Sequence, residues 1–207
     1  MDMKWMQAGY LAFGLIFLAG CSGLQPVRND VISTYALQMQ FQSSQAAQGG
    51  ESVLLVTRPR AHPGFESSRM AYVRKAHELE YFSRNQWVDT PEKMLAPLLV
   101  RAFETSGAFA AVSLATGGIT AQLRLDSEIV RLQQDFTSVP SSVRFTLRAQ
   151  LIDVAGRRIL ATREFDIVEN AASDAPYGGV VAANRAVHRA LSDAAGFFAA
   201  QAKGFKP

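Results

Sequence analysis

The feature that most constrains the fold is a strict alternation of apolar and polar residues in the second half of the chain. Odd positions from Val143 to Leu151 are apolar, while even positions such as Arg144 and Arg148 are polar. Successive side chains of a strand point to opposite faces of a sheet, so this period of two predicts a strand that is buried on one face. Strands of this kind are typical of antiparallel sheets with one face on a core.

The segments on either side show a related pattern. Residues 121–136 alternate as well, but the apolar side changes parity near Ile129, which predicts a β-bulge or bend there. Residues 158–168 alternate after the turn sequence Asp-Val-Ala-Gly-Arg at 153–157, which predicts a hairpin. We expect the apolar side of that last strand to consist of Ile159, Ala161, Phe165 and Ile167.

The first half of the chain predicts shorter strands. They are expected at 34–41, 53–56, 70–74 and 78–82, and a further short strand follows at 110–114. The run Val53–Val56 is apolar throughout, which is typical of a strand buried on both faces. Residues 58–64 contain two prolines and a glycine, so we expect a break in regular structure there.

Two helices complete the pattern. Thr90-Pro91-Glu92 is a typical helix start, with threonine as N-cap, and Gly107 is the expected stop. Pro97 lies inside this helix, where it predicts either a kink or a late start of the regular part. A last helix is expected from Gly178 to about Ala200. Its apolar residues from Val180 to Phe198 recur at helical spacing and predict the buried side, while Arg185, Arg189 and Asp193 are expected to face away. Together the pattern predicts an α+β fold: a single domain at 33–207 with a largely antiparallel sheet and two main helices packed on one face.

A separate signal lies near the N-terminus. Lys4 precedes an uncharged apolar segment at 8–18, which ends in Leu18-Ala19-Gly20-Cys21, and this layout is typical of a secretory signal. Cys21 is the only cysteine of the chain. The Leu-Ala-Gly-Cys sequence resembles the lipobox of bacterial lipoproteins. The resemblance implies a signal peptide at 1–20 that is cleaved and a covalent lipid on Cys21, with no other cofactor.

Other interpretations of this segment explain less. A bilayer span needs about 20 apolar residues, and the run between Lys4 and Cys21 is shorter. A core helix would have a polar face, and a plain secretory signal would not need a cysteine at the cleavage site. Durable anchoring takes at least two acyl chains, which a diacylglyceryl cysteine supplies. Ser22 after the cysteine favours the outer membrane, at its periplasmic face, by the sorting rule of enterobacterial lipoproteins.

The lipid would be joined to the domain by a short tether at 21–32. About a dozen residues reach roughly 40 Å at full extension, which favours work close to the membrane. The formal net charge of +3 is mild and could favour anionic lipid head groups, but it is not the concentrated charge of a nucleic-acid binder. With no second cysteine, the domain cannot form an internal disulfide, so its stability must come from packing.

No catalytic, cofactor or metal site is visible in the pattern. His62, His77 and His188 lie in different expected elements, without metal-ligand spacing. His77 is next to Glu78 and near Glu80, but a turn with alternating charges is far more often a solvated surface than an acid–base site. Trp87 is expected to be a core residue rather than a ligand platform. The glycine pairs at 117–118 and 178–179 lack a phosphate-loop context and are expected to form turns.

The passage from Ala71 to Gly107 resembles one family. It contains Val-Arg at 73–74, Leu-Glu-Tyr-Phe at 79–82, Asn-Gln-Trp at 85–87 and a leucine-rich helix opened by Pro91. Tyr-Ala-Leu at 35–37 and the alanine-rich closing helix agree with it. These motifs are similar to those of the ABC-type transport auxiliary lipoproteins, the PqiC-like components that accompany MCE-type lipid transport systems. Family members commonly carry arginine directly before the tryptophan, where this chain has Gln86.

The resemblance implies a non-enzymatic accessory subunit that helps to move lipids or other hydrophobic substrates across the periplasm and so supports membrane integrity. Its implied partner is an MCE-type periplasmic protein of a permease and ATPase system, and the lipoprotein would dock at the outer-membrane end of that path. The sequence leaves open whether the protein forms a homo-oligomer. The alternative is an outer-membrane lipoprotein that regulates a cell-wall synthase or an envelope assembly.

Overall fold

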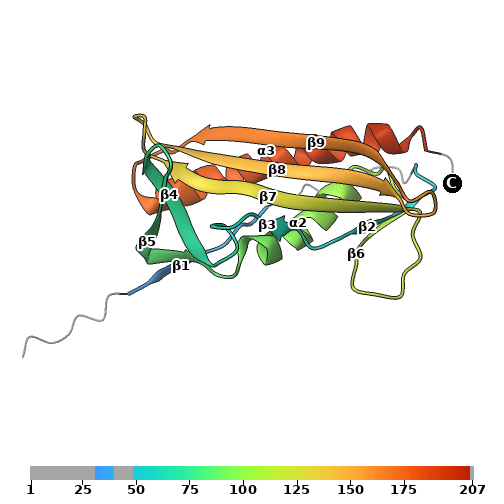
Figure 1. Ribbon diagram of the computed structural model, residues 1–207, viewed down its shortest axis with the longest axis horizontal. Coiled ribbons are helices and arrows are strands. Elements are labelled where there is room, and N and C mark those ends of the chain that lie inside the picture. Colours follow the sequence, from blue (N-terminus) through green and yellow to red (C-terminus); the bar gives the residue numbers. More distant parts are fainter. Residues whose placement is uncertain (1–30, 40–48, 206–207) are drawn as a thin grey trace, which may run out of the picture. The chain divides into compact units, whose positions relative to one another are not determined.

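The structure is a computed structural model that describes residues 31–39 and 49–205. Contacts divide the chain after Val31, and all the described helices and strands belong to the unit Ile32–Pro207. The predicted signal peptide and most of the predicted tether lie outside the described residues. In chain order the elements are β1 (Ser33–Tyr35), β2 (Val53–Val56), β3 (Arg60–Ala61), β4 (Arg69–Lys75), β5 (Glu78–Trp87), α2 (Pro91–Thr105), β6 (Ala111–Leu114), β7 (Leu123–Asp135), β8 (Ser142–Asp153), β9 (Arg158–Asn170) and α3 (Pro176–Ala202) (Figure 1).

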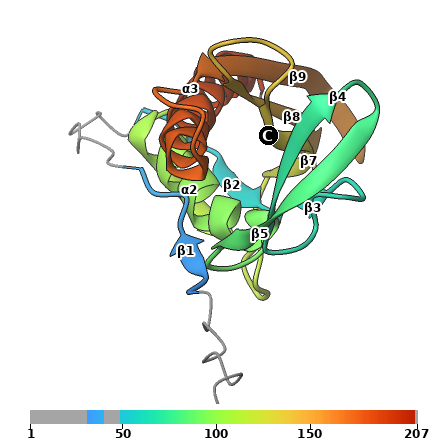
Figure 2. The same ribbon diagram turned by 90° about the vertical axis from the view of Figure 1, so that its left-hand side faces the viewer.

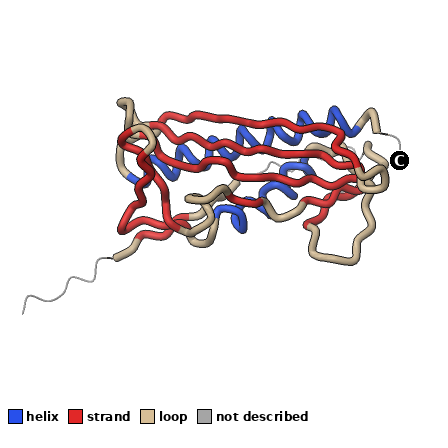
Figure 3. Tube along the Cα trace, viewed as in Figure 1, coloured by secondary structure: helices blue, strands red, loops and turns tan. Residues whose placement is uncertain are grey.

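Strand β7 is the centre of one mixed sheet. One of its edges pairs with β8 in antiparallel register over the whole strand, from Leu123 opposite Asp153 to Asp135 opposite Ser142. The sheet continues beyond β8 with β9, again antiparallel, so the three longest strands lie side by side (Figure 3). The other edge of β7 pairs with three short strands in turn: β2 at its start, β3 near its middle and β4 at its end.

The prediction of a largely antiparallel sheet is therefore correct for the long strands and incomplete for the short ones. The β4–β5 pair is antiparallel, but the pairs β1–β5, β2–β6, β2–β7, β3–β7 and β4–β7 are parallel. The parallel pairs join strands that are distant in sequence, and the periodicity of a single strand does not indicate the direction of its partner.

The parity change in β7 is a β-bulge, as predicted. The register shifts between Ile129, opposite Leu147, and Arg131, opposite Thr146, so Val130 is the extra residue. The bulge lets side chains on both sides of it enter the core: Ile129 and Leu132 are both buried.

A second bulge corrects the predicted apolar side of β9. Ile159 pairs with Ile152, but Ala161 pairs with Leu151, so Leu160 is the extra residue. Ile159 therefore points away from the face that carries Ala161, and 56% of it is exposed. The sequence pattern missed this bulge because Ile159 and Ala161 keep the same parity along the chain, although not in space.

The short strands differ from the predictions in three places. Strand β1 ends at Tyr35, and the described residues that follow, up to Met39, are not in a strand; residues 40 and 41 of the expected strand lie outside the described ranges. In β2 only Leu54 and Val56 are fully buried, so burial on both faces was wrong. Strand β3 lies inside the proline-containing break and was not predicted.

The strands predicted at 70–74 and 78–82 are β4 and β5, which form an antiparallel hairpin, and β5 extends further than expected, to Trp87. His77 takes a positive φ of 67° in the turn between the two strands. Three rings join the hairpin to the end of β7: the centroid of Tyr72 lies 4.5 Å from that of Phe82 and 5.8 Å from that of Phe136. This aromatic cluster holds the hairpin across one end of the sheet.

Helix α2 starts and ends where the sequence indicates. Thr90 is the N-cap by position and Pro91 is the first helical residue, but the Thr90 side chain makes no capping hydrogen bond. The neighbouring Asp89 carboxylate accepts the Thr90 N–H at 2.8 Å instead. Pro97 lies on the exposed side of a helix that continues through it, and Gly107 ends the turn with a φ of 63°.

Helix α3 packs against β8 and β9, and α2 packs against α3 and β6. Both helices therefore lie on the same face of the sheet, as predicted (Figure 2). The residues of α3 that face the sheet and α2 are all buried and most are small, which allows close approach of the helix. They include Val180, Ala182, Ala183, Ala186, Val187, Ala190, Leu191, Ala194 and Phe198.

The glycine pair at 178–179 is part of α3 and not a turn, which corrects the prediction. A Cβ on Gly179 would lie 2.1 Å from Oε1 of Gln134, and one on Gly178 would lie 2.3 Å from the carbonyl oxygen of Ser173. These glycines are needed because the helix start lies directly on its neighbours. The pair at 117–118 does form a turn, with positive φ at both residues.

Candidate functional site

The one site residue predicted from sequence, Cys21, lies outside the described residues, so its lipidation stays a prediction. The structure describes the domain that begins about a dozen positions later.

The histidines are not brought together. His62 follows β3, where its N–H bonds the Ile129 carbonyl at 2.8 Å, while His77 is in the β4–β5 turn and His188 is on the exposed side of α3. In residues 31–39 and 49–205, no group of three or more His, Cys, Asp or Glu side chains is arranged to hold a metal ion.

The carboxylates near His77 behave as a solvated surface, as expected. Glu80 accepts hydrogen bonds from Nε of Arg74 at 3.0 Å and from the Tyr72 hydroxyl at 2.9 Å. The hydrogen bond from Arg74, followed by that from Tyr72, lowers the pKa of Glu80. A general acid needs the opposite shift, so the arrangement suits an ion pair on the surface.

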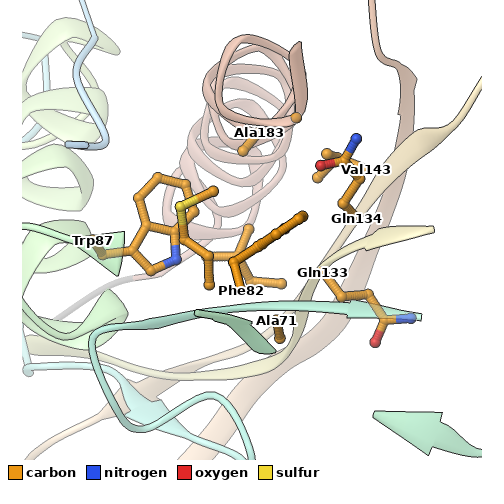
Figure 4. A pocket seen from close by; sticks show the side chains of 10 residues that line it. Ala71, Phe82, Trp87, Gln133, Gln134, Val143 and Ala183 are labelled. Atoms are coloured by element: carbon orange, nitrogen blue, oxygen red, sulfur yellow. The ribbon is translucent and has the colours of Figure 1, made fainter. Parts of the chain in front are cut away.

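Trp87 is buried, as predicted, and lines a small internal cavity of about 10 Å³ (Figure 4). The cavity lies between the β4–β5 hairpin and the start of α3, with Phe82 and Ala183 on its walls. Gln134 borders it, bonded through Nε2 to the Ser141 hydroxyl at 3.0 Å. The volume corresponds to about one water molecule, so this cavity is a packing feature of the core.

A large open groove of about 1230 Å³ runs along α3, and we call it the α3 groove. One wall is the extended segment Thr34–Met39. The others come from the exposed side of α3, from Leu98 of α2 and from Val88, and one end reaches the end of β9. The residues of α3 and β9 that line it are Glu169, Tyr177, Val180, Val181, Asn184, Arg185, His188 and Arg189.

Asn184 holds the first wall in place. Its Oδ1 accepts the N–H of Gln38 at 2.7 Å, and its Nδ2 donates to the Ala36 carbonyl at 3.3 Å. The side-chain amide thus pairs with both backbone groups of the segment, as a neighbouring strand would. Leu37 between them is buried. These bonds fix the chain that follows the tether against α3.

Charged groups line the part of the groove that lies next to the end of β9. Glu169 accepts a hydrogen bond from Arg189 and forms an ion pair with Arg185 at 3.5 Å. Arg185 also donates to the Asn170 carbonyl at 2.6 Å. The bond to Glu169 is the main cause of the raised pKa of Arg189. One carboxylate is thus shared by two guanidinium groups.

Sequence reasoning placed Arg185 and Arg189 on the outer side of α3 but did not find the groove. Asn184 and Tyr177 were not identified at all. The only local signal for them is position on a helix, opposite the apolar stripe. Their partners Ala36, Gln38 and Tyr35 are about 140 residues away in the sequence, so nothing local indicates these contacts.

Comparisons with known proteins agree with the fold. Protein XCC0632 from Xanthomonas campestris, of the family DUF330, is 24% identical and superposes with a TM-score of 0.75, covering 83% of this chain and 97% of that one. A second crystal structure, of an uncharacterized protein, is 12% identical with a TM-score of 0.64, covering 81% and 99%. No protein with a curated description is similar enough in sequence to count as a relative.

The family model of the ABC-type transport auxiliary lipoprotein component matches residues 35–195. The match runs from β1 into α3 and so includes the wall at 35–39, Asn184 and both arginines of the α3 groove. It covers most of the chain and agrees with the motifs between Ala71 and Gly107. The chain therefore belongs to the family of PqiC-like ABC-type transport auxiliary lipoproteins.

Proposed function

We propose that this protein is an outer-membrane-anchored accessory lipoprotein of an ABC/MCE-type transport system, which moves lipids or other hydrophobic substrates across the periplasm. It acts by binding and docking and is not an enzyme. The observation that carries the proposal is the family match over residues 35–195, because that family consists of auxiliary components of ABC-type transport. Transport energy and catalysis would belong to the permease and ATPase partners.

The proposed anchor is a diacylglyceryl group on Cys21, followed by a tether to Ile32 at the periplasmic face of the outer membrane. Each buried methylene contributes about 0.8 kcal/mol, so two or three acyl chains hold the protein durably. None of the described helices is long and apolar enough to cross a membrane. The lipid on Cys21 is the proposed means of attachment.

The proposed partner is an MCE-type periplasmic protein. Anchoring confines the encounter of two proteins to a thin layer, where effective concentrations reach the millimolar range, so a weak docking surface suffices. The described domain has one hydrophobic core that is shared by the sheet and both helices. Docking would use its outer surface.

Two experiments test these proposals separately. Mass spectrometry of the mature N-terminus should show an acylated Cys21, and Cys21→Ser should leave an unprocessed precursor because serine lacks the thiol that accepts the lipid. An unmodified cysteine at the mature N-terminus would disprove the anchor.

The partner is tested with the fragment 22–207 and a purified MCE-type protein from the same genome. We expect association at tens of micromolar or tighter in the absence of lipid. No association, together with binding to a cell-wall synthase, would favour the alternative role as a regulator of cell-wall synthesis or envelope assembly.

A further inference from the structure

The α3 groove is amphipathic, and its apolar part is open to solvent. Val88 and Tyr177 both line it, with exposed fractions of 61% and 64%. The ring of Tyr177 lies with its centroid 6.1 Å from that of Tyr35, on the wall that follows the tether. Large apolar side chains grouped in a hollow are unusual on a protein surface and mark a binding site for an apolar partner.

The charged end of the groove presents positive charge. The side chain of Glu169 is only 16% exposed, while those of Arg185 and Arg189 are 47% and 59% exposed. The two arginine side chains are thus more exposed than the carboxylate that they share. The carboxylate of Asp193, on the same helix, also raises the pKa of Arg189, but Asp193 does not line the groove.

We propose that the α3 groove seats an anionic phospholipid of the membrane surface, with the phosphate at Arg185 and Arg189 and the apolar part against Tyr177 and Val88. An apolar wall that ends in a pair of arginines matches the order of groups in such a lipid. Guanidinium groups bind phosphate oxygens in a bidentate manner, and tyrosine favours the interface between lipid and water.

The path of the chain supports a lipid rather than another occupant. The wall Thr34–Met39 directly follows the segment that leads to Cys21, and the intervening residues span at most roughly 40 Å. The inference in this respect rests on the proposed anchor: a domain held by that lipid keeps this wall within reach of the bilayer. Contact through the groove would then orient the domain on the membrane.

The test uses the fragment 22–207, which lacks Cys21. This fragment contains the complete described core, because every buried apolar residue lies between Leu37 and Ala202. Its binding to vesicles of phosphatidylcholine is compared with binding to vesicles that contain 30 mol% phosphatidylglycerol, a proportion chosen as about one lipid in three, by co-sedimentation. We expect binding to the anionic vesicles only, and a decline as salt is raised from about 0.05 to 0.3 M.

Substitutions of single arginines test whether the charged part of the α3 groove contacts the vesicle. Arg185→Gln and Arg189→Gln should each weaken vesicle binding about fivefold, the effect of one basic side chain near an anionic surface. Arg189→Lys should retain most of the binding because the charge remains. Arg148→Gln is the matched control, since Arg148 is an exposed arginine of β8 that does not line the groove. Thermal melting of each variant shows whether the fold is retained.

A second matched pair of variants tests the apolar wall of the groove. Tyr177→Ser should weaken binding severalfold, whereas Ile159→Ser should not, because Ile159 is similarly exposed but lies on β9 away from the groove. The proposal is overturned if anionic vesicles do not bind the fragment, or if the control variants lose binding as much as the groove variants.

The outcomes also separate this inference from the proposed function. Binding of the MCE-type protein is measured without lipid, so either result can fail alone. If the groove variants lose the protein partner and keep vesicle binding, the groove is a protein docking site and the lipid proposal is wrong.

Discussion

The two edges of β7 are built in different ways. On one edge β8 pairs with it continuously and β9 follows, so each strand is joined to the next by a short loop. On the other edge β2, β3 and β4 pair with it one after another, and the chain leaves the sheet between them. At the first edge, strands that are neighbours in the sequence pair with each other. At the second edge, each short strand forms only two or three residue pairs with β7, and the paired residues are far apart in the sequence.

The difference shows where this domain is held by pairing and where it is held by side chains. Continuous hairpins keep their register through many neighbouring backbone hydrogen bonds. The loss of one of these bonds therefore has little effect on the remaining ones. The short strands rely on individual contacts such as Trp87 in the core and Thr57 at the gap between β2 and β3. We call the edge of β7 that pairs with β2, β3 and β4 the short-strand edge and the edge that pairs with β8 the long-strand edge. We expect the short-strand edge to open first under native conditions.

The largest expected effects come from truncating one buried ring at each edge. Phe145→Ala on β8 and Trp87→Ala on β5 should each lower the free energy of unfolding by about 3–5 kcal/mol, because both side chains are buried in the core. Denaturant unfolding measures this loss. Hydrogen exchange should then differ: Trp87→Ala should speed exchange mainly within residues 69–87, and Phe145→Ala should speed it across the sheet.

The same pattern of exchange in both variants would show that the two edges unfold together. An unchanged melting temperature for Trp87→Ala would show that the ring contributes little to the core.

The next effect is expected where α3 meets the end of β7. Gly179→Ala should destabilise the domain by about 1–3 kcal/mol, because the added Cβ would lie 2.1 Å from Oε1 of Gln134. Gly196→Ala in the same helix is the control. It has no neighbour within 4 Å of the added Cβ, so it should stabilise by about 0.5–1 kcal/mol through helix propensity. Equal effects of the two substitutions would disprove the close contact.

A smaller effect is expected at the gap between β2 and β3. The Thr57 hydroxyl lies 3.1 Å from the Leu125 carbonyl oxygen and 3.1 Å from Oδ1 of Asp126. Thr57→Val should cost about 0.5–1.5 kcal/mol, the usual contribution of a hydrogen bond. Thr162→Val on exposed β9, which loses a bond from Gln150, should cost less. A larger loss for Thr162→Val would contradict the expected weakness of the short-strand edge.

The smallest effect concerns a charge on the long-strand edge. The hydrogen bond from Arg144 is the main reason that the pKa of Asp166 falls to about 2, below the unfolded value of about 3.9. A carboxyl with a lowered folded pKa contributes stability above the unfolded pKa and loses it as pH falls toward 2. Because both side chains are more than one-third exposed, we expect less than about 1 kcal/mol.

Asp166→Asn should therefore be slightly less stable than the unmodified protein at pH 7 and nearly equal to it near pH 2, as measured by urea unfolding across this range. A stability difference that grows toward low pH would contradict the ion pair.

The sequence alone determined the elements whose patterns are local. The period of two predicted β8, the parity change predicted the bulge beyond Ile129, and the apolar stripe predicted the buried side of α3. These predictions succeeded because each strand or helix buries one face, and the periodicity of its own residues records which face that is. The Leu-Ala-Gly-Cys sequence that ends at Cys21 is an equally local signal. The lipid on Cys21 stays a prediction, because this residue lies outside the described ranges.

Only the tertiary structure decided the parallel pairs, strand β3 and the α3 groove. Strand β3 is two residues long and exists because β7 offers it a backbone edge; no side-chain pattern requires it. The groove depends on Asn184 meeting Ala36 and Gln38, a contact between residues almost 150 positions apart. A polar side chain on the outer face of a helix has many acceptable neighbours, so its own sequence does not select one. The packing of the whole chain makes that choice, since it brings the start of the domain against its last helix.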